Sequence, residues 1–236
     1  MPELPEAEVA ARQLRERVVG ATVRDCWIGR EDIVREGLPS LEQYRQAKIS
    51  GVERKGKSVI LHFLCGKEPR FLVAELGMTG LLLFRSTLTK HPQHTHFILH
   101  LDGCCEPDIR YWNPRRFGRL SLLDRAGLDR YVARRFGHDP LTISHEKFLR
   151  VLRATRSRLK SLLMHQQVIA GIGNIYANEI LFRSRLHPNQ PSNSIPGKSI
   201  TRLHQVMGEV LREAIAMGGS SVRDYFAPDG TEGQYK

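Results

Sequence analysis

Apolar residues recur at helical spacing at the start of the chain, and the pattern becomes strand-like after Gly20. Ala7, Ala10, Leu14 and Val18 follow one another three or four positions apart, and Gly20 supplies a stop signal. One amphipathic helix is therefore predicted over residues 5–19. Runs of β-branched, aromatic and aliphatic residues then predict strands over residues 21–29, 58–64, 71–76, 80–84, 95–101, 109–112 and 118–123. Several short strands at this spacing favour a β-sandwich.

The second half of the chain has a helical pattern. Residues 124–145 are predicted as loop and short helix, and apolar residues are then placed periodically at Phe148, Leu149, Leu152, Leu159, Leu162 and Leu163. We therefore expect an α+β protein with a β domain over residues 1–140 and a helical domain over residues 141–236.

The chain is strongly basic. Of its 236 residues, 36 are Lys or Arg and 25 are Asp or Glu, so the formal net charge is +11. This charge favours a polyanionic partner such as nucleic acid, although a merely soluble basic protein would share it. No apolar run approaches the roughly 18 residues of a membrane span, and the N-terminus lacks the order of a secretory signal, so a cytoplasmic protein without a membrane partner is expected.

The first residues place an unusual chemical group at the end of the polypeptide. Removal of Met1 would leave Pro2 with a free secondary amine, and an α-amino group titrates near pH ~8. A secondary amine condenses with an aldehyde carbon to a charged iminium, which is covalent catalysis of the Schiff-base kind. Glu3, and Glu6 one helical turn later, are candidates for proton transfer. The alternative is an ordinary helix start, in which Pro5 suits the first turn and the acids complement its positive end.

A glycine-bearing turn in the helical half is a candidate phosphate site. The sequence GIGNIYANE at residues 171–179 follows a stretch without acids that carries Arg150, Arg153, Arg156, Arg158 and Lys160. A turn followed by a helix that opens at Asn174 would direct backbone N–H groups and the positive end of the helix dipole at a phosphate. The alternative is an ordinary helical corner with a solvated basic face.

Two loops in the β half offer residues that could enter DNA. The sequences LGMTG at residues 76–80 and NPRRFG at residues 113–118 predict exposed turns. An apolar side chain on such a loop can insert between base steps, and an arginine beside it can occupy the place of an extruded base. Met78 and Phe117 are the apolar candidates, although such side chains more often serve cores. Lys57 stands before a predicted strand, where a lysine is usually solvated.

Histidines form a cluster that raises the alternative of a metal site. The cluster consists of His91, His94, His96 and His100, close to Cys104 and Cys105. Three of these histidines, His94, His96 and His100, would share one face of a strand. However, a metal needs converging ligands, and the four cysteines lack the CxxC spacing of a zinc ribbon. We therefore predict no metal here and expect the cysteines to be reduced thiols.

Four of these motifs resemble those of the bacterial formamidopyrimidine-DNA glycosylases, also called 8-oxoguanine DNA glycosylases. The similar segments are the start PELPEAE, the loops GMTG and PRRFG, and GIGNIYANEILF, and they occur in the family order between residue 2 and about residue 235. The resemblance implies a β-sandwich with a leading helix, followed by a helix-two-turn-helix domain. It also implies that a monomer binds DNA in the basic cleft between the two domains.

The resemblance further implies a role for each motif. Pro2 would attack the sugar C1′, Glu3 would protonate the sugar oxygen, Glu6 would order the active-site helix, and β- and δ-elimination would cut the strand. The partner would be double-stranded DNA with damaged bases or abasic sites, contacted by Lys57, Met78, Arg115, Arg116, Phe117, Lys160, Gly173, Asn174 and Tyr176. PELPE and PRRFG favour oxidised purines as substrates. A relative specific for oxidised pyrimidines and a non-catalytic module that binds damaged DNA are the alternatives.

Three features depart from the family pattern. Glu75 stands where relatives commonly have a histidine that helps to hold a phosphate, so we expect it to turn away, to be neutralised by a neighbouring Lys or Arg, or to weaken binding. His165 occupies a position that is usually acidic. Residues 218–230 look like the segment before the family's C-terminal zinc finger, but no cysteine follows Cys105. These 236 residues are therefore expected to bind no cofactor, and a zinc ion only if the finger exists.

Overall fold

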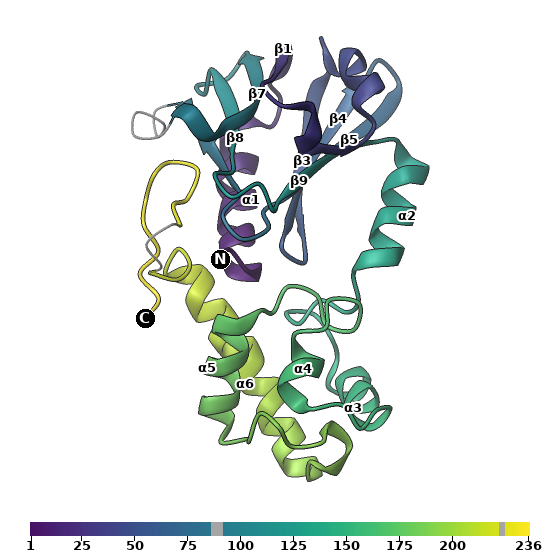
Figure 1. The fold of residues 1–236 in the computed structure, drawn as a ribbon, viewed down its shortest axis with the longest axis vertical. Helices are drawn as coiled ribbons and strands as arrows, with labels where there is room; N and C mark the ends of the chain where they lie inside the picture. The colour runs from purple at the N-terminus through teal and green to yellow at the C-terminus, as the bar shows by residue number, and fades with distance from the viewer. Residues whose placement is uncertain (86–91, 222–224) are drawn as a thin grey trace.

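The protein has a β domain and a helical domain, and the N-terminus lies between them (Figure 1). The computed structural model describes residues 1–85, 92–221 and 225–236. Helix α1 (Leu4–Val18) starts at the junction and packs against the strands. Its first turn contains a proline and a capping box between Glu3 and Glu6, which satisfies backbone groups that the helix itself leaves free. The helix predicted from the apolar spacing is thus confirmed.

The strands join into one nine-stranded sheet in the order β2-β9-β5-β4-β3-β1-β7-β8-β6. Neighbouring strands are antiparallel except β2 and β9, which are parallel. Their bounds are β1 (Thr22–Ile28), β2 (Val34–Glu36), β3 (Lys48–Lys55), β4 (Ser58–Cys65), β5 (Glu68–Glu75), β6 (Leu81–Phe84), β7 (Thr95–Asp102), β8 (Asp108–Trp112) and β9 (Arg119–Leu123).

The two halves of this sheet share one hydrophobic core. Leu61 on β4, Leu99 on β7 and Tyr111 on β8 belong to the same buried cluster, although they come from opposite sides of β1 in the strand order. The sheet therefore folds over itself as a sandwich does, and Ala7 and Leu14 of α1 pack into the same core. The expected α+β class is confirmed, since a helical domain follows the sheet.

Strands β2 and β3 were missed in the sequence. Strand β2 has only three residues, which is too short for an alternating pattern to appear. In β3 the alternation is broken, because the pairing with β4 shifts register between Ile49 and Gly51. A bulge of this kind moves the following side chains to the other face of the sheet.

The helical domain follows α2 (Arg125–Arg135), which connects the two domains (Figure 1). Its helices are α3 (His145–Arg153), α4 (Leu159–Leu163), α5 (Asn174–Ser184) and α6 (Gly197–Ala216). Periodic apolar residues such as Phe148, Leu163 and Ile180 are buried between them. None of the helices in the described ranges is long and apolar enough to cross a membrane.

Several contacts hold the two domains in place. Leu4 of α1 packs into the core of the helical domain, whereas Ala7 packs into the core of the β domain. The guanidinium of Arg54 in β3 donates to Glu8 Oε2 at 2.8 Å and to Asp139 Oδ2 at 2.6 Å. The boundary near residue 140 stays a prediction, because α1 contributes to both cores.

Candidate active site

Glu3 lies at the junction of the two domains and caps helix α5. Its side chain is fully buried. The Gly173 N–H donates to Glu3 Oε2 at 2.7 Å, and the Ile175 N–H donates to Glu3 Oε1 at 2.9 Å. The residue at the start of α5 is Gly173, which has no side chain to bind these N–H groups. The carboxylate of Glu3 therefore supplies the cap and attaches the start of the chain to α5.

Lys57 shares this junction with Glu3. A Cβ atom on Gly173 would lie 2.4 Å from Lys57 Nζ and 2.5 Å from the carboxyl carbon of Glu3, so the two charged groups meet where only glycine leaves room. Burial raises the pKa of Glu3, while the Lys57 charge and the α5 N–H groups oppose this rise. Burial lowers the pKa of Lys57, against the attraction of the Glu3 and Glu6 carboxylates. A raised pKa suits a proton donor.

Pro2 and Glu6 complete the buried start of the chain. Pro2 is buried next to Glu3, while Met1 is 36% exposed. Glu6 Oε2 accepts from the Glu3 N–H at 2.8 Å. Glu6 Oε1 accepts from the Tyr176 hydroxyl at 2.6 Å and from the Ser220 N–H at 2.7 Å. Glu6 thus holds the backbone beside Pro2 and connects it to α5 and to the C-terminal segment.

Two of the sequence-based expectations for α5 concern groups that already have partners within the protein, and both stay predictions. The N–H groups of the Gly173 turn were expected to face a phosphate, but Glu3 occupies those of Gly173, Ile175 and Tyr176, the last at 3.4 Å. Tyr176 was expected to contact DNA, but its side chain is fully buried and its hydroxyl binds Glu6. The first expectation came from the local pattern and the second from the family resemblance, and neither can reveal that residue 3 reaches this helix.

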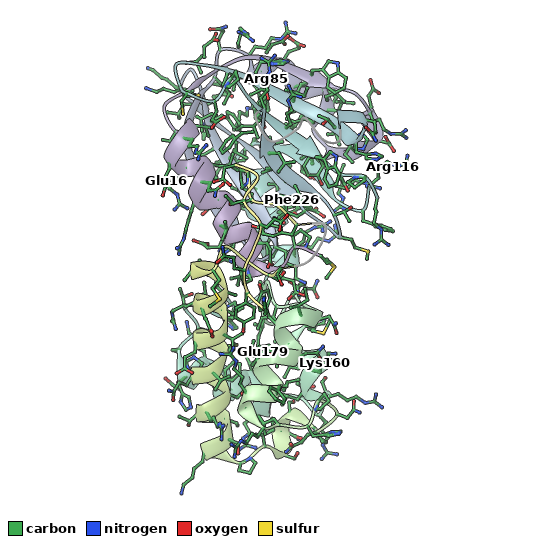
Figure 2. The ribbon with its side chains drawn as sticks, turned by 90° about the vertical axis from the view of Figure 1, so that its left-hand side faces the viewer. Glu16, Arg85, Arg116, Lys160, Glu179 and Phe226 are labelled. Carbon is green, nitrogen blue, oxygen red and sulfur yellow. The ribbon has the colours of Figure 1, made fainter. Side chains whose placement is uncertain are left out.

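Lys160 and Asn174 remain at the surface beside this turn. Lys160 Nζ donates to Asn174 Oδ1 at 2.8 Å, and this hydrogen bond orients the Asn174 amide group. Figure 2 shows Lys160 of the helical domain and Arg116 of the β domain on the same side of the protein, while Glu16 lies on the other side. Cationic candidates from both domains therefore face the same direction.

The loops with Met78 and Phe117 lie against each other. A Cβ atom on Gly77 would lie 2.5 Å from the Gly118 nitrogen, so the two backbones touch. The Arg115 N–H also donates to Thr79 Oγ1 at 3.3 Å. Segments about forty positions apart in the sequence are thus joined into one surface.

Met78 and Phe117, the two candidates for insertion between base steps, differ in exposure on this surface. Phe117 is 58% exposed, and the Arg115 guanidinium lies 5.3 Å from the centre of its ring. Met78 is only partly exposed. Arg116 is exposed and has a φ angle of 55°, and its carbonyl accepts from the Arg119 guanidinium, which supports this unusual backbone conformation.

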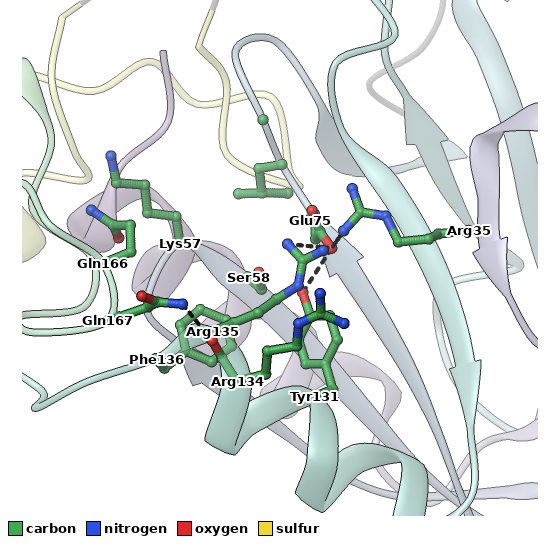
Figure 3. A pocket seen from close by; sticks show the side chains of 12 residues that line it. Arg35, Lys57, Ser58, Glu75, Tyr131, Arg134, Arg135, Phe136, Gln166 and Gln167 are labelled. Carbon is green, nitrogen blue, oxygen red and sulfur yellow. Dashed lines mark hydrogen bonds and ion pairs between the residues drawn. The ribbon is translucent and has the colours of Figure 1, made fainter.

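Glu75 is neutralised by neighbouring arginines, which is one of the three outcomes expected for it. Its Oε1 lies 2.7 Å from Arg35 Nη1 and 3.3 Å from Arg135 Nη1, and it accepts from the Tyr131 hydroxyl at 2.9 Å. Figure 3 shows this cluster at one side of a cavity that Lys57 also lines. These three partners were missed, because nothing in the local sequence around Glu75 indicates residues from β2 and α2.

The histidine cluster does not form a metal site in the described part of the chain. His94 belongs to a 3-10 helix, Pro92–His94, and not to the strand in which it was expected. The His96 ring hydrogen bonds to the Asn113 carbonyl at 3.1 Å. His91 lies outside the described residues. Among the described residues, no group of three or more His, Cys, Asp or Glu side chains could hold a metal ion.

Gln166 organises the turn before α5 and was also missed. Its Nε2 donates to the carbonyls of Met164 and Ile172, each at 2.8 Å, and its Oε1 accepts from the Gly171 N–H at 2.8 Å. His165, the other departure in this turn, is exposed, and its carbonyl accepts from the Val168 N–H at 2.8 Å. The turn is therefore closed by an amide side chain and by backbone bonds that do not need an acid at position 165.

Two family models match the sequence. The model described as the formamidopyrimidine-DNA glycosylase N-terminal domain matches residues 1–120. The model described as the formamidopyrimidine-DNA glycosylase H2TH domain matches residues 136–225. Residues 222–224 of this second match lie outside the described part of the structure.

Curated relatives and solved structures agree with these models. The formamidopyrimidine-DNA glycosylase of Thermus thermophilus is 38% identical over 241 residues, which cover 100% of this chain and 85% of the relative. The Thermomicrobium roseum enzyme of the same name is 36% identical over 252 residues, covering 100% of this chain and 86% of the relative. The crystal structure of MutM (Fpg) from Thermus thermophilus has a TM-score of 0.85 and 36% identity, with 98% of this chain and 84% of that chain covered.

A further solved structure holds wild-type Lactococcus lactis Fpg in a complex with DNA that contains N7-benzyl-Fapy-dG. It has a TM-score of 0.86 at 28% identity and covers 99% of this chain and 85% of that chain. Both family models, the relatives and the fold lead to the same assignment. The chain therefore belongs to the formamidopyrimidine-DNA glycosylase family.

Proposed function

We propose that this member of a DNA glycosylase family is a bifunctional DNA glycosylase and abasic-site lyase of base excision repair. Its substrates are oxidised purines, 8-oxoguanine and formamidopyrimidines, in double-stranded DNA, and it acts as a monomer in the bacterial cytoplasm. The observation that carries the proposal is the buried junction at which Glu3, next to Pro2, meets Lys57 and the start of α5. The DNA complex of the Lactococcus lactis relative supports DNA as the partner.

The proposed reaction begins with attack of the Pro2 nitrogen on C1′ of the damaged nucleotide. The bond between C1′ and the base breaks, the base leaves with its electron pair, and the proton that the Pro2 nitrogen loses on forming the new bond passes to the base. Glu3, whose pKa is raised by burial, gives its proton to the sugar ring oxygen, and the ring opens to an iminium between Pro2 and C1′. Loss of a C2′ proton then expels the 3′ phosphate, and a second elimination expels the 5′ phosphate. Water hydrolyses the iminium and frees Pro2.

The junction also supports roles for the cations. Lys57, held beside Glu3, binds a phosphate of the damaged strand, and Lys160 with Asn174 binds the backbone nearby. Arg116 contacts the duplex on the side that Lys160 also faces, and Arg115 of the same exposed loop contacts the duplex as well. Met78 and Phe117 fill the space that the extruded nucleotide leaves.

One assay tests the proposed function. A labelled duplex with a single 8-oxoguanine is expected to be cut at the lesion with phosphate at both new ends, whereas the undamaged duplex stays intact. A shift in mobility without a cut would indicate a non-catalytic binding module. Cutting of duplexes with oxidised pyrimidines alone would indicate the pyrimidine-specific branch.

Phe117→Ala is expected to weaken binding to lesion DNA by up to a few kcal/mol, because unstacking a base step costs about that much. Binding to plain duplex should change less. Titration with duplexes that carry an abasic-site analogue measures the difference. Phe182→Ala is the matched control, since Phe182 is 79% exposed on α5 and lies outside both loops. An equal loss of lesion binding in both variants would contradict the insertion of Phe117 between base steps. So would normal extrusion of the damaged nucleotide in Phe117→Ala, as reported by a fluorescent base analogue.

We propose that these 236 residues bind no zinc ion. The zinc finger of the family needs four converging ligands. All four cysteines, Cys26, Cys65, Cys104 and Cys105, lie in the β domain as free thiols, and burial raises the pKa of Cys26 to about 12. Together with the absence of a ligand cluster among the described residues, this donor set does not fit the metal.

A further inference from the structure

A cavity of about 690 Å³ opens beside Lys57, between the two domains (Figure 3). The ends of β4 and β5, the last turn of α2 and the turn at Gln166 and Gln167 line it. Of the described residues that line it, four are cationic and one, Glu75, is anionic. The cations are Arg35, Lys57, Arg134 and Arg135. The cavity therefore has a surplus of positive charge that attracts an anion.

Glu75 holds two of these arginines but cannot neutralise both. One of its oxygens, Oε1, receives Arg35 at 2.7 Å, Arg135 at 3.3 Å and the Tyr131 hydroxyl at 2.9 Å. The carboxylate carries a single charge, and its side chain is only 16% exposed. Each guanidinium has five N–H donors, and the contact with Glu75 uses one nitrogen of each. Both arginine side chains are 38% exposed, so further donors can reach a ligand.

The arginines are held in defined positions before any ligand arrives. The Arg135 guanidinium lies 5.0 Å from the centre of the Tyr131 ring, and the Tyr131 hydroxyl binds the same Glu75 oxygen as Arg135 does. A planar guanidinium with its orientation restricted loses less conformational entropy when it binds an oxyanion. The cluster thus has the properties of a preorganised anion site.

We propose that Arg35 and Arg135 bind a phosphodiester group of DNA in this cavity, with Glu75 as the residue that positions both guanidinium groups. The proposal rests on the proposed function, since it requires DNA in the cleft. Ser58, which follows Lys57, pairs directly with Glu75 across β4 and β5, so Lys57 and Glu75 lie at the same end of neighbouring strands. A DNA strand with one phosphate at Lys57 therefore extends past the arginine pair, whose forks match two phosphate oxygens.

The salt dependence of binding tests this proposal. Dissociation constants for a duplex with a non-cleavable abasic-site analogue are measured over a range of salt concentrations for wild type, Arg35→Gln and Arg135→Gln. Each variant is expected to bind more weakly, and its slope of log affinity against log salt should be shallower by at most about 0.9, the contribution of one fully neutralised phosphate. Arg24→Gln is the matched control, because Arg24 forms an exposed ion pair with Asp102 at 3.3 Å and does not line the cavity. Its slope should equal that of wild type.

The outcomes distinguish failure of the phosphodiester site from failure of the proposed function. If the wild-type protein binds the duplex and both cavity variants keep the slope of Arg24→Gln, the phosphodiester site is excluded while the proposed function stands. If the wild-type protein binds no DNA, the proposed function itself fails. A separate experiment adds inorganic phosphate to wild type and to both cavity variants at constant ionic strength and measures their thermal unfolding. Thermal stabilisation of wild type that both cavity variants lose, combined with unchanged DNA slopes, would show a site for free phosphate and overturn the proposal.

Discussion

Protein that retains Met1 is expected to release no damaged base and to form no covalent adduct with DNA, whereas protein without Met1 does both. A proline nitrogen that is joined to Met1 is a tertiary amide and has no basic electron pair for attack on C1′. Met1 is 36% exposed, so removal of this residue frees the amine at the buried junction. Borohydride trapping on a labelled 8-oxoguanine duplex, followed by peptide mass spectrometry, measures the adduct and locates it.

Pro5→Ala is the matched control for this prediction. Pro5 belongs to the first turn of α1 but carries no terminal amine, so this variant should still form the adduct through residue 2. Pro2→Gly keeps a terminal amine of a different kind and should trap through residue 2 at a changed rate. An adduct on Lys57, or undiminished lyase activity with Met1 in place, would exclude Pro2 as the nucleophile.

Glu3→Gln is expected to slow base release by about 10²- to 10⁴-fold, the usual contribution of a positioned proton donor. It should also lower the free energy of unfolding by about 1–3 kcal/mol, because a donor is left without its acceptor. Both Glu3 oxygens accept N–H groups of α5, and a glutamine would present its NH₂ to one of them. Single-turnover rates and thermal unfolding measure the two effects.

Glu8→Gln separates catalysis from stability. Glu8 lies on the same helix and accepts from Arg12 and Arg54, so this variant also loses a partly buried charge interaction but leaves the junction with Gly173 intact. It should be destabilised without a comparable loss of base release. Because the pKa of Glu3 is raised, the wild-type rate of base release should fall as the pH rises through that pKa. This fall with pH should be absent in Glu3→Gln. Equal rate losses in both variants would assign Glu3 a structural role.

Local pattern in the sequence was enough to predict most of the elements and the class of chemistry. Helix α1 and seven of the strands follow from apolar spacing, because neighbours two, three or four positions apart decide which face of an element is buried. The loops at Met78 and Phe117 could be predicted from glycine and proline, whose backbone preferences are local. The terminal proline and its carboxylates belong to one short segment, so the candidate nucleophile was visible without any structure.

Only the tertiary structure decided which distant groups meet. Glu3 caps a helix that begins 171 positions later, which removes three N–H groups from the phosphate site expected there and buries Tyr176 against Glu6. A carboxylate at position 75 is by itself unfavourable for DNA binding, and only the tertiary structure places Arg35 and Arg135 beside it. Such contacts depend on how whole elements pack, because burial and the surrounding charges set the pKa of a carboxyl and the partners of its oxygens. No spacing within the sequence carries that information.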